Sequence, residues 1–223
     1  MSEIALFLST NYRSFGLAGC AIIIFAMLFT AVGYSGRKQE KYSALNHFIS
    51  ELGEAGVSAR AQVFNGGLIV GGLLLIPFII GFGIFLHSLW ATLAIVSGVW
   101  AAISCMLVGV FPMNNLNPHI KAAVSYFRAG LVMVFLFGIA ILVQPAGPEK
   151  VSSLASVTSL LAVLAYASFL FLLRKPEDGA QAGDQPLDPD IIPDRPRVWI
   201  LPALEWLVFV STIIWFFANA FFF

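Results

Sequence analysis

Long apolar stretches alternate with short polar segments along the whole chain. The candidate membrane spans are residues 15–34, 64–86, 88–111, 122–143, 151–173 and 199–223. About 20 residues of helix cross the roughly 30 Å of hydrocarbon in a bilayer, and each stretch has about that length. The pattern predicts an all-α polytopic membrane protein, a single integral domain over residues 1–223 built as a six-transmembrane-helix bundle.

The apolar run from Phe64 to Phe111 is interrupted only by His87 and Ser88. At about 1.5 Å per residue, one continuous helix over this run would be more than twice as long as a single crossing needs. We therefore expect two spans joined by a tight turn at His87. Six spans place both chain termini on one side of the membrane.

The composition excludes an ordinary soluble domain. Hydrophobic residues make up 59% of the 223 residues, charged residues make up 11%, and the mean hydropathy is +0.90. A soluble domain carries about 25% charged residues. Cys20 and Cys105 lie inside apolar runs and resemble small hydrophobic residues there. We expect membrane lipids as partners and no nucleic acid.

The basic residues of the loops are distributed unevenly. Loops one, three and five carry nine Lys and Arg residues, whereas the opposite side carries only Arg13 and Lys150. Cytoplasmic loops retain basic residues, so these three loops are predicted to be cytoplasmic and both termini extracytoplasmic, in the cell membrane. Loop five, residues 174–198, is rich in Pro, Gly and Asp, and this composition predicts a disordered linker.

Loop one contains a helical pattern. Leu45, Phe48, Ile49 and Leu52 recur at helical spacing, with Ser43 as a candidate N-cap and Gly53 as a candidate stop. This predicts a short amphipathic helix lying at the cytoplasmic membrane interface, with its apolar face either in the lipid or against the bundle. His47 and Glu51 are four residues apart on its polar side, joined by Ser50. They form either a solvated ion pair worth about 0.2–0.5 kcal/mol or part of a metal site.

Loop three carries polar groups on the same side of the membrane. Asn114 and His119 lie there, next to Pro112 and Pro118, which are expected to keep the segment out of the flanking helices. We expect loops one and three to close over each other, so that His119 or Asn114 reaches Ser50, Glu51 or Glu54. The result would be a polar pocket at the cytoplasmic face.

Two ionisable residues, Arg128 and Glu205, lie inside predicted spans near the cytoplasmic ends. A charge in this environment is costly unless it is paired or hydrated, so we expect them to pair beneath the polar loops. Snorkelling toward the headgroups is the alternative, and it is easier for Arg128 than for Glu205. The predicted ligand-binding residues are therefore His47, Ser50, Glu51, Asn114, His119, Arg128 and Glu205.

These residues favour a non-enzymatic role in which the pocket binds a lipid headgroup or a partner subunit. A small transporter or lipid conduit is the first alternative, and a metal-dependent intramembrane hydrolase is the second. A hydrolase of the ceramidase type needs three histidines and an Asp close together, and this chain does not place them on one face. We therefore expect no catalytic residue, no metal and no cofactor.

Gly67 and Gly71 in the second span match the close-packing motif of membrane helices. Most such motifs pack helices within one bundle. The alternative is a homo-oligomer, or contact with another membrane protein, through these two glycines.

Four short strings carry a resemblance to a known family. They are His47-x-x-Ser50-Glu51-Leu52-Gly53, Phe64-Asn65-Gly66-Gly67, Gly109-Val110-Phe111-Pro112 and His119-x-x-Ala122. In them the chain resembles a family of bacterial and archaeal six-span membrane proteins of unknown function, and is more distantly similar to the eukaryotic DRAM and Sfk group.

The resemblance implies a six-helix bundle and gives no reaction. It marks Ser50, Glu51, Gly53, Pro112 and His119 as characteristic positions. Asn114 and Asn115 stand where the family pattern suggests an acidic residue, and this departure weakens a metal or proton role.

Overall fold

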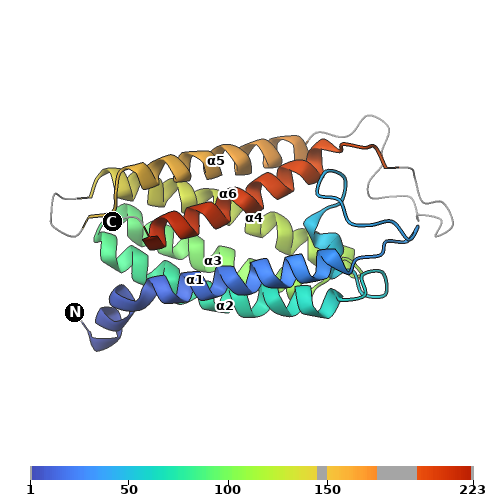
Figure 1. Cartoon of the computed structure of the whole chain (residues 1–223). Helices are drawn as coiled ribbons and strands as arrows, with labels where there is room; N and C mark the ends of the chain where they lie inside the picture. The colour runs from blue at the N-terminus through green and yellow to red at the C-terminus, as the bar shows by residue number, and fades with distance from the viewer. Residues whose placement is uncertain (1, 145–149, 175–194, 222–223) are drawn as a thin grey trace.

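Six long helices lie side by side along one axis in the computed structural model, which describes residues 2–144, 150–174 and 195–221 (Figure 1). The helices are α1 (Glu3–Val32), α2 (Ala61–Leu86), α3 (Leu89–Val110), α4 (Leu116–Leu142), α5 (Leu154–Leu173) and α6 (Ile200–Phe221), and a short 3-10 helix, η1 (Ile49–Gly53), lies in loop one. All six helices are long and apolar enough to cross a membrane. The predicted six-helix membrane bundle is confirmed.

The helices form a closed ring. Each helix packs against the next one along the chain, and α6 also packs against α1. Loops one and three lie at one end of the bundle, which we call the loop-one end, while α1 begins and α6 ends at the opposite end (Figure 1). The six helices therefore surround a common axis, and loop one lies across one end of the bundle. The predicted linker of loop five falls mostly on residues 175–194, outside the described residues.

The turn between α2 and α3 is the tight hairpin expected from the sequence. His87 adopts a left-handed backbone conformation, with φ 45° and ψ 44°, and ends α2. The Ser88 hydroxyl then accepts a hydrogen bond from the Ala91 N–H at 3.1 Å and caps α3. The two spans are thus separated by a two-residue reversal.

Two helices begin at least six residues earlier than expected. The first begins at Glu3 rather than near residue 15, because the apolar residues before Arg13 continue the helix and Ser2 caps it through the Ala5 N–H at 3.3 Å. The fourth begins at Leu116, so Pro118 lies in its first turn. A proline is tolerated there because the backbone N–H that it lacks would have no helical partner. The expectation that Pro118 excludes loop three from the helix was wrong.

Gly67 and Gly71 allow α2 to approach α1 closely. A Cβ atom added at Gly67 would collide with the side chain of Ala26, and one added at Gly71 would collide with the side chain of Ile23. The motif therefore packs two helices of the same chain. Association with other proteins stays a prediction.

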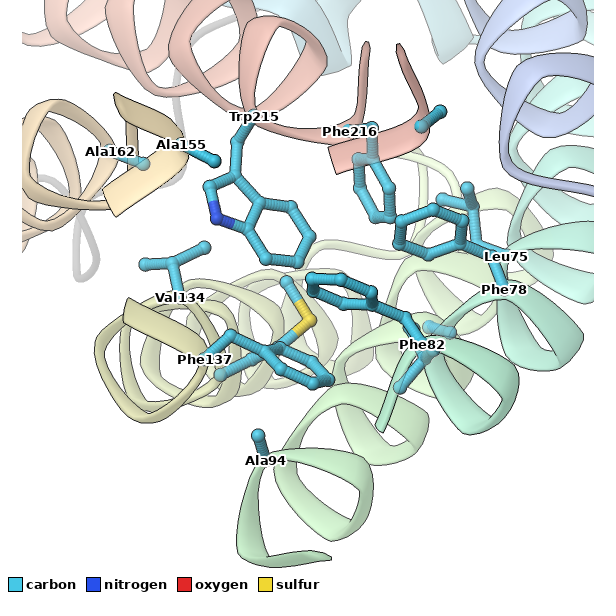
Figure 2. Packing of buried hydrophobic residues seen from close by; sticks show 14 of the residues in the cluster. Leu75, Phe78, Phe82, Ala94, Val134, Phe137, Ala155, Ala162, Trp215 and Phe216 are labelled. Atoms are coloured by element: carbon cyan, nitrogen blue, oxygen red, sulfur yellow. The ribbon is translucent and has the colours of Figure 1, made fainter. Parts of the chain in front are cut away.

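The half of the bundle remote from loop one is filled with aromatic rings, which we call the aromatic layer (Figure 2). It consists of Phe78, Phe82, Phe137, Trp215 and Phe216. Their ring centroids lie 5.0–6.2 Å apart in mostly edge-on or tilted pairs, a geometry that favours aromatic contacts. Trp215 also donates its indole N–H to the Ser159 hydroxyl at 2.8 Å. The layer closes the bundle axis at this level.

Candidate binding site: a capped cavity inside the bundle

Loop one folds back over the bundle axis. Its residues 42–58, which we call the cap, contain η1, and Ile49 and Ser50 of that element line a cavity beneath it. The helix expected from Ser43 to Gly53 is shorter than predicted: only Ile49–Gly53 is helical, and it ends at Gly53 as expected. Leu52 is buried against the bundle, which was one of the two expected positions of the apolar face. Glu51 was expected on the polar side and is also buried, so that part of the prediction was wrong.

A buried ion pair holds the cap to the start of α6. Arg195 donates from Nη1 to Oε1 of Glu51 at 2.9 Å and from Nη2 to Oε2 at 2.7 Å, a two-pronged geometry. Nη1 also donates to the Asn46 carbonyl at 3.1 Å. The Glu51 side chain is only 6% exposed and that of Arg195 is 29% exposed. Burial disfavours the guanidinium charge, but the hydrogen bond and charge of Glu51 outweigh it and raise the pKa of Arg195.

The predicted pairing of His47 with Glu51 is wrong. His47 is buried against the rings of Tyr34 and Tyr42, and its Nδ1 accepts from the Ser43 N–H at 3.3 Å. Its Nε2 lies 3.7 Å from Oε1 of Glu40. The histidine thus packs in an aromatic cluster, which Trp206 extends by donating to the Tyr42 hydroxyl at 3.0 Å.

Loop three does close against the cap, as expected, but through different atoms. The Asn114 side chain accepts from the Ala55 N–H at 2.7 Å and donates to the Ala55 carbonyl at 2.8 Å. Ser50 donates weakly to the Met113 sulfur at 3.4 Å. His119 does not take part, because it is buried in α4 with its Nδ1 2.8 Å from the Phe111 carbonyl. The expectation that His119 joins the carboxylates was wrong.

Arg128 and Glu205 do not form the expected ion pair. Within the described residues, the salt bridges of the cap involve other partners, and the two side chains lie in different places. Arg128 is exposed on the outer surface of α4, where it lines a groove beside α3. Glu205 is buried and lines the cavity under the cap. The depth estimated from the sequence was similar for both residues, but the helical faces differ.

The cavity lies between the cap and the aromatic layer and has a volume of about 110 Å³. Side chains from all six helices line it, and most of them are apolar. Glu205 supplies a carboxylate at the loop-one end, where its Oε2 accepts the Ile49 N–H at 2.6 Å. One buried acid is thus hydrogen-bonded to the roof of an otherwise apolar chamber.

A short chain of hydroxyl groups crosses the cavity wall. Thr212 donates to the Tyr166 hydroxyl at 3.1 Å, and Tyr166 donates to the Tyr126 hydroxyl at 3.3 Å. In this arrangement the Tyr126 hydrogen has no acceptor among the described protein groups, and Tyr126 lines the cavity. The cavity therefore offers both a carboxylate acceptor and a hydroxyl donor to a guest molecule.

Several of these residues were not predicted from the sequence. Arg195 was counted only as one basic residue of loop five, although its place just before the last span puts it on the side of loop one. Tyr126, Tyr166 and Thr212 are hydroxyl-bearing residues within apolar spans, and their polarity in that setting was the available signal. In residues 2–144, 150–174 and 195–221, no three His, Cys, Asp or Glu side chains gather where they could hold one metal ion.

Comparison with known proteins gives one family match. A family model described as "Protein of unknown function (DUF998)" matches residues 17–221, which includes the cap, Arg195 and every residue named for the cavity. No curated protein and no solved structure matches the chain.

Proposed function

The chain belongs to this uncharacterised DUF998 family, and we propose that it is a membrane protein that binds an amphiphilic molecule in its capped cavity. The guest would have an apolar chain and a hydroxyl or amine group, as a lipid or lipid-derived molecule does. The observation that carries the proposal is Glu205, a buried carboxylate at one end of an apolar chamber. This develops the predicted headgroup binding, and moves it from the loop surface to the bundle interior.

The chemistry of the lining supports a donor group on the guest. Oε2 of Glu205 already accepts the Ile49 N–H, while Oε1 accepts from no protein group in the part of the chain that the structure describes. A carboxylate can accept more than one hydrogen bond, and a hydroxyl or ammonium group on the guest would supply another donor. The apolar walls would hold the rest of the guest, because burying apolar surface contributes about 25 cal/mol per Å².

Binding is favoured over passage through the bundle. A conduit needs a continuous path along the axis, but the aromatic layer fills the axis beyond the cavity with buried rings (Figure 2). The cavity therefore has one polar end and a closed floor. This arrangement suits a binding site better than the transporter or conduit considered from the sequence.

The test uses three probes with the same chain length: octylamine, octanol and octanoate. A guest that binds the folded state raises the unfolding temperature, which intrinsic fluorescence of the purified protein in nanodiscs reports. We expect octylamine to stabilise most, octanol less and octanoate least. Glu205→Gln should remove the preference for octylamine. Glu3→Gln, the same change at an exposed position of α1, should leave it unchanged.

A second variant separates cavity binding from general membrane effects. Cys105→Phe places a ring in the cavity and should abolish stabilisation by octylamine and octanol, whereas Leu164→Phe on the exposed face of α5 should not. Equal responses to all three probes, or an unchanged response in Cys105→Phe, would refute the proposal.

Four further properties expected from the sequence are also proposed. These are location in the cell membrane with extracytoplasmic termini, recruitment of a partner subunit at the cap, a bacterial or archaeal origin of the family, and distant similarity to the DRAM and Sfk group. The uneven distribution of basic residues supports the orientation.

A further inference from the structure

A second hollow lies on the outside of the bundle, between α3 and α4. It has a volume of about 890 Å³, and it is lined by residues 93–100 of α3 and residues 120–136 of α4. Its lining shares no residue with the lining of the cavity beneath the cap. It faces the surroundings of the bundle rather than its axis. We call it the groove.

The groove is cationic at one end and apolar at the other. Lys121 and Arg128 are the ionisable residues of its lining, and no carboxylate is among the lining residues. Both cations are exposed, and neither is in a salt bridge with any described residue. Leu93, Val132 and Leu136 line the end remote from loop one. The groove thus has a charged end and an apolar end, which match the headgroup and the chain of an amphiphile.

An exposed Arg inside a membrane span needs an explanation, because an isolated charge in hydrocarbon is costly. Side chains on a helix point toward its N-terminus, and the N-terminus of α4 is at the loop-one end. Arg128 therefore extends back toward Lys121, which is seven residues, or about 10 Å, nearer the membrane surface. Both positive groups are therefore directed toward the headgroups at the loop-one end.

The dimensions fit one lipid molecule. From Lys121 to Leu136 the groove follows α4 for fifteen residues, about 22 Å at 1.5 Å per residue. The hydrocarbon of a single leaflet is about 15 Å thick, half of the roughly 30 Å core. A headgroup at the two cations would leave enough length of apolar groove for an acyl chain.

Polar groups also line the groove between its two ends. Trp100 donates its indole N–H to the Ser125 hydroxyl at 2.9 Å, and that hydroxyl lies 3.0 Å from the Ser104 hydroxyl. These bonds fix Trp100 against α4, next to the turn that carries Arg128. A rigid aromatic wall beside a cation is suited to hold the glycerol region of a lipid.

We propose that the groove between α3 and α4 binds an anionic phospholipid, with its phosphate at Lys121 and Arg128 and one acyl chain along Val132 and Leu136. This site is separate from the cavity and does not depend on what the cavity binds. The charge pattern selects an anionic over a zwitterionic headgroup, because two cations without a nearby carboxylate favour net negative charge.

The experiment is native mass spectrometry of the purified full chain, titrated with phosphatidylglycerol or phosphatidylcholine in mixed micelles. We expect the first phosphatidylglycerol to bind about tenfold more tightly than phosphatidylcholine, the ratio expected from one charge-assisted hydrogen bond. Arg128→Gln should remove most of this preference, and Arg128→Lys should retain much of it. Lys150→Gln, which removes a cation at the opposite end of the bundle, is the matched control and should behave like the wild type.

A shape variant tests the acyl-chain half of the groove. Val132→Trp keeps both cations and fills the groove, so it should weaken the first phosphatidylglycerol without unfolding the protein. Leu161→Trp, on the exposed face of α5, is its control.

Equal binding of the two lipids to the wild type would overturn the proposal. So would a loss in Lys150→Gln as large as that in Arg128→Gln. A dimer that dissociates in Val132→Trp while phosphatidylglycerol binding persists would show that a second copy of the chain occupies the groove, and would also overturn it.

Discussion

Replacing Arg195 with Met should destabilise the cap more than any other single change near the loops. The substitution keeps much of the side-chain volume but removes both hydrogen bonds to Glu51. Because the Glu51 side chain is only 6% exposed, its charge would stay buried with weaker partners. Breaking a fully buried pair costs about 3–5 kcal/mol, and Arg195 is partly exposed, so we expect about 2–3 kcal/mol.

Glu51→Gln should cost less than Arg195→Met. It leaves behind Arg195, whose side chain is 29% exposed and can reach water, and it keeps an acceptor for the Phe48 N–H that now donates to Oε1 at 2.8 Å. The double variant should lose less free energy of unfolding than the sum of the losses in the single variants, because the first substitution has already removed the ion pair. A difference of this kind identifies a direct interaction.

The assay is thermal unfolding in detergent, followed by intrinsic fluorescence. A loss of 2–3 kcal/mol corresponds to a lowering of the midpoint by roughly 5–10 °C for a chain of this size. Arg197→Met is the matched control, because Arg197 is exposed in the same segment before α6. If Arg195→Met and Arg197→Met shift the midpoint equally, or if the two substitutions at Glu51 and Arg195 are additive, the ion pair does not hold the cap.

Three further predictions concern the loops and the orientation. Asn114→Ala removes both side-chain hydrogen bonds to Ala55, so backbone hydrogen exchange of residues 49–57 should become faster. Asn115→Ala is the control and should have little effect. Equal exchange rates in the two variants would contradict the role of Asn114. Burial raises the pKa of Tyr42, although its bond from Trp206 acts in the opposite direction. The raised pKa contributes stability that is complete below about pH 10, where the unfolded tyrosine titrates, and that is lost as pH rises above that value. Above about pH 10 the unfolding temperature should therefore fall less steeply in Tyr42→Phe than in the wild type. Parallel curves for the two proteins would refute this prediction. Cysteine at the exposed position of Ala44 should resist a membrane-impermeant thiol reagent added to intact cells, and cysteine at Ser153, at the opposite end, should react; the reverse result would invert the orientation.

The membrane bundle could be predicted because its determinants are local. Length and apolar composition define each span, and His87 with Ser88 defines the α2–α3 turn without reference to the rest of the chain. The start of α1 was misplaced because Arg13 was taken as a boundary, although a single Arg inside a long apolar helix does not end it.

The cap could not be predicted because its determinants are distant in sequence. Glu51 lies four residues from His47, but its partner is Arg195, 144 residues away. Spacing within loop one therefore gave the wrong pair and the wrong exposed face. Likewise, Arg128 and Glu205 have similar depths, but the rotation of each helix about its axis decides which side chain faces the cavity and which faces outward.

The bond between Glu205 and the roof of the cavity comes from a main-chain donor. Every residue except proline would supply a backbone N–H at position 49. The side chain at this position can therefore change in size or polarity without loss of the bond to Glu205. A roof built in this way separates attachment from selectivity: the backbone keeps it in place, and the side chain that projects into the cavity can be exchanged to admit a different guest. Position 49 is therefore where a reshaped site, or an environment-sensitive fluorescent side chain, could be introduced with the fewest consequences for the fold.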